Sequence, residues 1–441
     1  MRTEENINKT PMKSNHLREI ITEEEFLKLA HNAAIEVLRI SLFLEDVKKE
    51  QKVFNKKLFY VIASVSRDLE DFLDDYGAKN NRTWHFFREL IASARNFGFI
   101  AFLVEHIEKS HTGPKEQKLF KEYFEKTNEI KSYFNQVLLH IFKLIREEAR
   151  KLKISFPPKG LGEMYYYDIP SNKTLPQNLE EGEAKNEREK IIKICSEYIN
   201  TIKEFEELEC NCFYSANELR KIVPQKINEE KIRRFELFIH NLESVYDTYV
   251  KGTAIESEDA RLNQLRTQIS ITLHLLEIAR GLVHFFERHE KINELLEIAI
   301  PNNNVLNCAV NWALYYANQI METSRVLADE LLKEYTSIDS IELPVPKELG
   351  FHLRPSTLVA KVVNHYGSDV YMIVGEDRFD AKSILSITWA GGKIAREKIE
   401  KVKFVGDKRV LKDLEILASV NYGEDHMGKD QPLPKELSYL R

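Results

Sequence analysis

Glycine is scarce through most of this sequence and is unevenly distributed. Of the 16 glycines among 441 residues, eight lie in the first 349 residues and the other eight fall between Gly350 and Gly428. Glycine supplies the positive φ that tight turns require, so a glycine-poor stretch with regular apolar spacing is typical of long helices. The uneven distribution predicts a large helical region followed by a smaller, turn-rich domain of about ninety residues.

The sequence also lacks an excess of basic residues and a long apolar run. Its 64 Lys and Arg residues and 70 Asp and Glu residues give a formal net charge of −6, whereas nucleic acid-binding domains usually carry a basic excess. No apolar stretch approaches the ~18 residues of a membrane-spanning helix. The polar N-terminus has no apolar segment typical of a signal peptide. We therefore expect no nucleic-acid partner, no membrane span and a cytoplasmic location.

Cysteine is rare, and the histidines form no metal-binding pattern. The two close cysteines, Cys210 and Cys212, have a Cys-Asn-Cys spacing that is neither a redox motif nor a zinc site. Most of the 13 histidines lie in sequence with helical periodicity, where a surface or core-edge imidazole is the ordinary interpretation. The long helical region contains no nucleotide-binding loop and no nucleophile triad. We expect reduced thiols, no metal and no cofactor.

The pattern of helix signals and breaks predicts a multidomain chain. Thr22 with Glu25 three residues later is a capping box, and apolar residues then recur at helical spacing. Proline and glycine cluster only over 157–187 before the helical pattern resumes. The predicted parts are a disordered tail (1–21), a helical bundle (22–156), a linker or loop (157–187), a second helical bundle (188–336), a small α+β domain (337–423) and a C-terminal tail (424–441).

The last domain shows short elements in the order β-α-β-β-α-β-α. Alternation of apolar and polar residues predicts strands at 340–345, 369–374, 378–382 and 400–405, with a turn at Gly375. Helical spacing predicts helices over 354–366, 383–390 and 407–420, the second closed by Gly391 and Gly392. This order indicates an α+β layer, in which one antiparallel sheet carries helices on one face.

His352 is the histidine whose sequence context suggests chemistry. It lies in Gly350-Phe351-His352-Leu353-Arg354-Pro355, where the glycine permits a sharp turn and the proline suits the first turn of a helix. A helix N-terminus attracts anions through its N–H groups and its dipole, and the Arg354 guanidinium adds donors suited to phosphate. An imidazole beside such a phosphate site can act as a nucleophile and carry a phosphoryl group.

Ser383 is a second residue with two interpretations. It precedes the helix predicted over 383–390, where a serine commonly caps the N-terminus. A phosphoserine at this position would add about −1.5 to −2 charges beside an exposed surface and could act as a switch.

These motifs together resemble the histidine-containing phosphocarrier protein (HPr) family of the bacterial phosphoenolpyruvate:sugar phosphotransferase system. The resemblance covers about Ile338 to Val420, and it rests on G-F-H-L-R-P at 350–355, H-Y-G-S-D-V at 365–370 and A-K-S-I-L-S-I at 381–387. It implies the family's fold, an α+β open-faced β-sandwich, which the predicted element order matches. It also implies that His352 accepts and passes on the phosphoryl group and that Arg354 steadies it. Ser356 and Thr357 fall at the phosphate-binding helix N-terminus, with Ser356 where the family usually has alanine.

The same resemblance implies partners. An enzyme I-type phosphodonor would load His352, and a sugar-specific protein would accept the phosphoryl group. Ser383 resembles the serine that HPr kinase phosphorylates in some bacteria. Ile384, Leu385 and Ile387 fall where the family docks its partners. The helical region resembles nothing known to us, and its partner stays unidentified.

Two functions from different classes fit this sequence. The first is a phosphocarrier, which relays phosphoryl groups without turning over a small molecule, so that "enzyme" describes it only loosely. The second is a regulator in which the small domain senses phosphotransferase flux and the helical region is the effector. A structural protein with an inactive carrier domain fits less well, because His352, Arg354 and Ser383 occur together.

Overall fold

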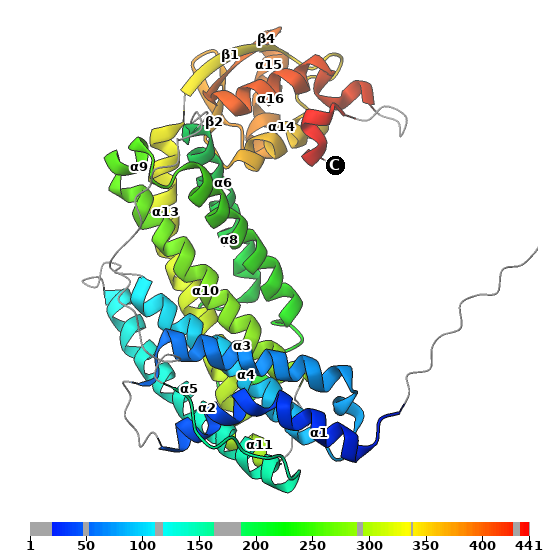
Figure 1. Ribbon diagram of the computed structural model, residues 1–441. Coiled ribbons are helices and arrows are strands. Elements are labelled where there is room, and N and C mark those ends of the chain that lie inside the picture. The colour runs from blue at the N-terminus through cyan, green and yellow to red at the C-terminus, as the bar shows by residue number, and fades with distance from the viewer. Residues whose placement is uncertain are drawn as a thin grey trace, which may run out of the picture.

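The computed structural model describes residues 20–46, 53–110, 118–162, 187–288, 294–336, 338–426 and 433–440. It consists of an elongated helical body and a small α+β domain at one end of that body (Figure 1). The predicted N-terminal tail (1–21) lies outside the described residues apart from Ile20 and Ile21, and so does the greater part (163–186) of the predicted linker.

The helical body runs from residue 20 to residue 336 of the described chain. Its helices are α1 (Glu23–Ala33), α2 (Ile35–Asp46), α3 (Lys56–Asp75), η2 (Ala78–Asn80), α4 (His85–Ser110), α5 (Lys118–Lys151), α6 (Glu187–Phe205), η4 (Glu206–Leu208), α7 (Ala216–Ile222), α8 (Glu229–Tyr249), α9 (Ala254–Glu258), α10 (Ala260–Arg288), α11 (Glu294–Ala299), α12 (Asn302–Leu306), the π-helix η5 (Asn307–Leu314) and α13 (Tyr315–Tyr335).

Local sequence signals set the starts of several of these helices. The predicted capping box is present at α1: the Glu25 N–H donates to the Thr22 hydroxyl, and the Thr22 N–H donates to the Glu25 carboxylate. Asn55 caps α3 by accepting from the Leu58 N–H. Each such cap satisfies a main-chain donor that the helix itself leaves unpaired.

The two halves of the body share one hydrophobic core. A single cluster of buried residues extends from Phe26 to Leu332, across the predicted linker. The central helices α4 and α10 pack on each other, with the rings of Phe97 and Phe285 edge to face at 5.1 Å. The Asn96 amide also donates to the Gly281 carbonyl at 3.1 Å. The predicted bundles 22–156 and 188–336 are therefore joined through a common core, in which α4 packs on the C-terminal part of α10.

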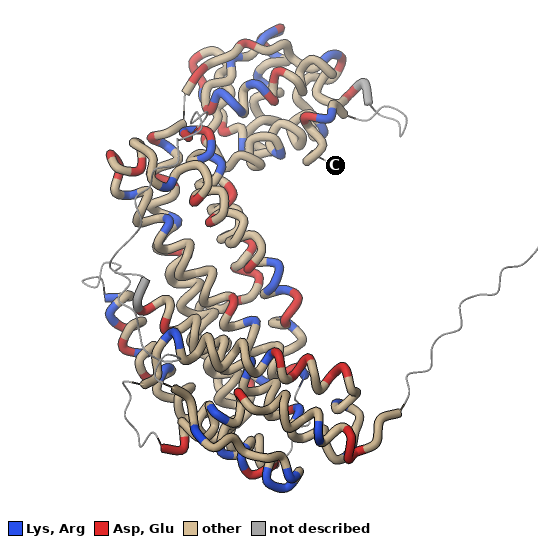
Figure 2. Tube along the Cα trace, viewed as in Figure 1, with Lys and Arg blue, Asp and Glu red and all other residues tan. Residues whose placement is uncertain are grey.

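Two of these core helices are long and apolar enough to cross a membrane by length and composition alone. They are the stretch His85–Glu108 of α4 and the helix Ala260–Arg288, and 72% and 78% of their most apolar windows are buried inside the protein. Burial against other helices accounts for their apolar character. Basic and acidic residues are interspersed along the body and the small domain in the view of Figure 2.

His106 makes the stability of the body dependent on pH. Burial, with smaller contributions from His274 and Lys56, lowers the pKa of His106 from 6.5 to about 4. The unfolded chain therefore takes up a proton more readily than the folded chain, so stability is lost as the pH falls from about 6.5 towards 4. We expect His106→Asn to weaken this loss, measured as the urea midpoint of helical circular dichroism at several pH values.

The matched control for this experiment is His240→Asn, which changes an exposed histidine of α8. If His106→Asn and His240→Asn keep the same pH dependence as the unmodified protein, His106 is not its source.

The C-terminal domain has the predicted element order. Its elements are β1 (Ile338–Pro344), α14 (Leu353–Tyr366), β2 (Val370–Val374), β3 (Asp377–Asp380), α15 (Ile384–Glu397), β4 (Lys401–Asp407), α16 (Lys408–Ser419) and the 3-10 helices η6 (Asn421–His426) and η7 (Lys435–Leu440). The strands form one antiparallel sheet in the order β1-β4-β2-β3. The predicted fold class, a helical region followed by a small α+β domain, is confirmed.

One face of this sheet is covered by helices. Val370, Met372 and Val374 alternate along β2 and are buried, as are Val402 and Phe404 on β4. Because successive strand residues point to opposite faces, this alternation assigns the buried set to a single face. The buried set shares a cluster with apolar residues of α14, α15 and α16.

Two details differ from the sequence-based expectations. Helix α15 does not close at Gly391 and Gly392 but continues to Glu397, and it ends at Lys398 in the left-handed conformation. Part of the predicted C-terminal tail is packed: Leu437 and Leu440 are buried in the core of the domain. Leu437 and Leu440 are three residues apart in a short 3-10 helix, and two apolar residues are too few to show a periodicity in the sequence.

Candidate functional site

A turn and a helix start fix the position of His352. Gly350 has φ +60°, in the left-handed region that favours glycine. His352 follows in an extended conformation as the N-cap residue of α14, and Pro355 occupies the first turn of that helix. The predicted placement of a histidine at the mouth of a helix N-terminus is what this structure contains.

The residue before His352 anchors it to the core. Phe351 is buried and makes edge-to-face contacts with Tyr422 at 5.0 Å and Phe404 at 6.4 Å. Helix α15 passes so close to it that a Cβ on Gly391 would lie 2.5 Å from the Phe351 carbonyl oxygen. Gly391 is therefore explained by a close approach of two backbones and not by a helix end.

Glu424 is a member of this site that sequence reasoning missed. Its Oε2 lies 3.3 Å from His352 Nε2, and its Oε1 lies 4.0 Å from Arg354 Nε. The contact between His352 and Glu424 has the distance of an ion pair but is not a hydrogen bond, because His352 Nε2 is buried without a hydrogen-bond partner. Glu424 Oε1 is also buried without one. A carboxylate thus lies at the helix N-terminus, where anions are favoured.

A turn after α16 presents this carboxylate. Asn421, Tyr422 and Gly423 all have positive φ, and the Asn421 side chain accepts from the Lys347 N–H while the Tyr422 hydroxyl donates to the Pro344 carbonyl. A glycine after a helical pattern signals a helix end. Gly423 therefore indicates the end of α16 in the sequence, but no nearby residue indicates that the following turn lies next to His352.

Ser356 and Thr357 use their hydroxyls within the helix. Ser356 is fully buried, and its Oγ donates to the Phe351 carbonyl at 3.3 Å. Thr357 Oγ1 donates to the Leu353 carbonyl at 2.6 Å. Both hydroxyls therefore donate to main-chain carbonyls at the start of α14, and the Ser356 bond stabilises the turn that contains His352.

Ser383 caps α15, as one of its two interpretations requires. Its Oγ accepts from the Ser386 N–H at 3.2 Å, and the residue is half-buried. Of the predicted docking residues, Leu385 is 81% exposed and Ile384 is half-buried, but Ile387 is buried in the core and offers no contact surface. Ile387 points inward because it lies one helical turn from Ala390 and two from Ile394, on the face that covers the sheet.

Four large apolar side chains are exposed on the two elements that form this site, the turn into α14 and the helix α15. Leu349 and Leu353 flank His352 in the chain, and Leu385 and Trp389 lie on the exposed side of α15; all four are between 68% and 81% exposed. We call these four residues the apolar rim. Exposed apolar residues gathered in one place mark an interaction surface.

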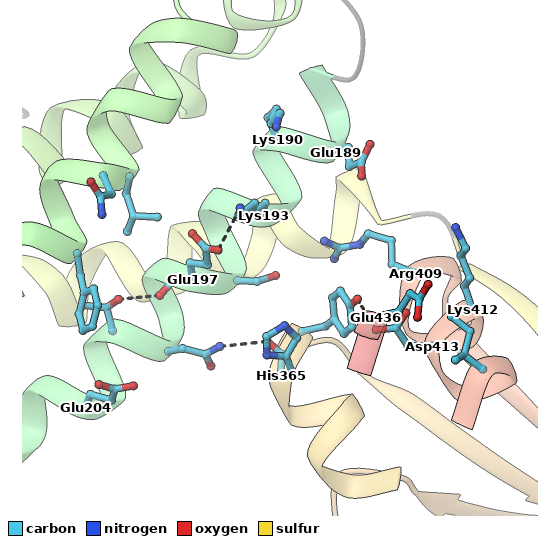
Figure 3. Close-up of a pocket in the computed structure, with 18 residues that line it drawn as sticks. Glu189, Lys190, Lys193, Glu197, Glu204, His365, Arg409, Lys412, Asp413 and Glu436 are labelled. Carbon is cyan, nitrogen blue, oxygen red and sulfur yellow. Dashed lines mark hydrogen bonds and ion pairs between the residues drawn. The ribbon is translucent and has the colours of Figure 1, made fainter. Parts of the chain in front are cut away.

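The described helices of the body do not cover His352. The body meets the domain at the other end of α14, where the Asn200 amide of α6 donates to the His365 carbonyl at 3.4 Å (Figure 3). The His352 side chain keeps 34% of its surface exposed. Across the described ranges, no group of three or more His, Cys, Asp or Glu residues could hold a metal ion.

Comparison with known proteins identifies the region that contains this site. The family model described as the PTS HPr component phosphorylation site matches residues 340–394, which include His352, Arg354 and Ser383. No curated protein matches the chain, and no solved structure matches it either. The C-terminal region therefore matches the HPr family over residues 340–394, whereas the helical region has no family match.

Proposed function

We propose that this protein is a phosphocarrier of the phosphoenolpyruvate-dependent phosphotransferase type, reversibly phosphorylated on His352. The observation that carries the proposal is a partly exposed histidine at the N-cap of α14, close in sequence to Arg354, within a region that matches the HPr phosphorylation-site family. A family match in the C-terminal region supports a phosphocarrier role in general. The donor, the acceptor and the individual roles of the residues are our proposals.

The transfer step needs a nucleophilic ring nitrogen and an anion site. Glu424 covers Nε2, so we expect Nδ1 to attack the phosphorus of a phosphorylated donor protein. A phosphorus–nitrogen bond forms, the bond from phosphorus to the donor atom breaks, and the donor atom keeps the electron pair. The helix N-terminus and Arg354 would then stabilise the charge on the phosphoryl oxygens.

The apolar rim supports docking of a protein donor. Leu349 and Leu353 of the rim flank His352 in the chain, and all four rim residues are more than two thirds exposed. A partner with a complementary apolar groove could bury the rim and bring its own phosphoryl group to the histidine. An enzyme I-type donor and a sugar-specific acceptor would use this surface in turn.

Glu424 is expected to limit how long the phosphoryl group stays on His352. A phosphohistidine places about two negative charges beside the Glu424 carboxylate, and like charges repel. We predict that Glu424→Gln raises the equilibrium ratio of phosphorylated to free protein by about 1.5- to 5-fold, the equivalent of ~0.2–1 kcal/mol for a partly exposed pair. Phosphate content at a fixed ratio of phosphoenolpyruvate to pyruvate measures it.

Glu415→Gln is the matched control, because it removes an exposed carboxylate of α16 elsewhere in the same domain. A lower phosphorylated fraction in Glu424→Gln than in Glu415→Gln would mean that Glu424 assists the transfer instead of opposing it.

Loading and discharge test the proposed function. With enzyme I and labelled phosphoenolpyruvate, the chain should gain an acid-labile, alkali-stable label, and a sugar-specific acceptor should then remove it. A chain that gains no label is not a phosphocarrier.

The alternative function is a regulator whose helical region acts as the effector. The size of the helical body favours it, since a carrier domain needs none of these helices to expose His352. HPr kinase with ATP should then place a stable label on Ser383, and labelling of either residue should change which proteins the full chain captures. A label that persists when sugar-specific acceptors are added, together with altered capture, would favour the regulator over the carrier.

A further inference from the structure

One helix connects the candidate phosphorylation site to the helical body. Helix α14 has His352 at its N-cap and His365 in its last turn. Its 14 residues correspond to a rod of about 21 Å at 1.5 Å per residue. The C-terminal end of this rod meets α6, where Gly367 lies next to the Asn200 side chain.

The contact between α6 and the C-terminal domain is small and polar. The Asn200–His365 hydrogen bond is long, at 3.4 Å. A cavity of about 710 Å³ opens beside it between α6, α8 and the domain, and Figure 3 shows charged side chains of both parts facing across it. A second cavity of about 820 Å³ lies between Arg188 on α6 and Lys408 on α16. Small and polar contacts of this kind permit domains to move relative to each other.

Two segments near the C-terminus pack on opposite ends of the same helix. Helix η6 contacts α14 and brings Glu424 to His352. Helix η7 also contacts α14, and its Tyr439 ring stacks on His365 with the centroids 3.7 Å apart. The hydroxyls of Tyr439 and Tyr366 both donate to Asp413 Oδ2, at 2.6 and 2.7 Å. The segments that contact His352 and His365 are therefore both packed on the same helix, α14.

We propose that the junction between α6 and the C-terminal end of α14 reports the phosphorylation state of His352 to the helical body. The proposal rests on the phosphocarrier function. Phosphorylation repels the Glu424 carboxylate and displaces its turn, which is packed on α14: a Cβ on Gly423 would lie 2.7 Å from Leu358 Cδ1. A shift of α14 changes the His365–Tyr439 stack and loosens the contact with Asn200.

Hydrogen exchange of the full chain tests this coupling. Intact mass first gives the phosphate content, and exchange is then compared between the free and phosphorylated protein. Phosphorylation should speed exchange in the peptides that cover 196–204 of α6 and the end of α14 by roughly fivefold or more, the lower end of usual allosteric coupling.

Tyr439→Leu should speed exchange at the junction without phosphate and remove most of the phosphate-dependent difference. Tyr60→Leu, at an exposed tyrosine of α3, is the matched control and should behave as the unmodified chain. Full phosphorylation with unchanged exchange at α6 would overturn the coupling and leave the phosphocarrier function standing. An unaltered response in Tyr439→Leu would also overturn it. A chain that takes up no phosphate would overturn both.

Discussion

Replacing His352 with alanine is expected to abolish the acid-labile label that enzyme I and phosphoenolpyruvate place on the protein. The imidazole is the nucleophile in our account, and the hydroxyls of the first turn of α14 cannot replace it. Ser356 is buried and donates to the Phe351 carbonyl, and Thr357 donates to the Leu353 carbonyl. Residual label in the variant should therefore fall to the background of the assay.

The matched control is His85→Ala, which removes a half-exposed histidine of the helical body. It should keep the full label, because α4 lies in the body and takes no part in the site. If His352→Ala retains acid-labile label, another histidine carries the phosphoryl group and the assignment fails. Circular dichroism of His352→Ala should match the unmodified chain, since the side chain is partly exposed and fills no core position.

Gly391→Ala is expected to damage the site by a different route. Its new Cβ would lie 2.5 Å from the Phe351 carbonyl oxygen, a backbone atom that cannot turn aside. Overpacking of this kind costs about 1–3 kcal/mol of domain stability. It also moves the residue that precedes His352, so we expect the rate of phosphorylation to fall roughly 10- to 100-fold.

Gly392, the next residue in the chain, provides the matched control for Gly391→Ala. A Cβ on Gly392 would meet nothing within 4 Å, and Gly392 lies in the same helix. Gly392→Ala should therefore be neutral or stabilising by about 0.4–1 kcal/mol, because alanine reduces the entropy of the unfolded chain. Thermal unfolding of the domain and phosphorylation rates should separate the two variants. Equal effects of both substitutions would contradict the packing argument.

Local signals in the sequence were enough to predict the C-terminal domain. The alternation in 340–345 and 400–405 corresponds to β1 and β4, and the Gly350 turn with Pro355 set His352 at a helix start. These features depend on residues a few positions apart, which turn chemistry and periodicity describe well. The family resemblance added the chemistry of the histidine.

Contacts between distant parts of the chain could not be predicted in the same way. Glu424 reaches His352, and Gly391 approaches Phe351, only because the domain folds back on itself. Judged from neighbouring residues alone, Gly391 and Gly392 indicate the end of a helix. One of them is instead a packing requirement inside a continuous helix, and only the position of the neighbouring backbone distinguishes the two cases.

The helical body illustrates the same limit on a larger scale. Its helices could be located from capping and spacing, as the capping box at Thr22 shows. The contact between α4 and α10, which joins the two halves, depends on complementary shapes such as Phe97 against Phe285. Apolar stripes say that a helix is buried but not against which partner.

Tandem mass spectrometry of the full chain, kept at alkaline pH after incubation with enzyme I and phosphoenolpyruvate, tests the central claim most directly. Our account predicts one phosphoryl group per chain, located on His352 within the peptide that contains Arg354. A chain that stays unphosphorylated, or a phosphoryl group found on any other residue, would contradict it.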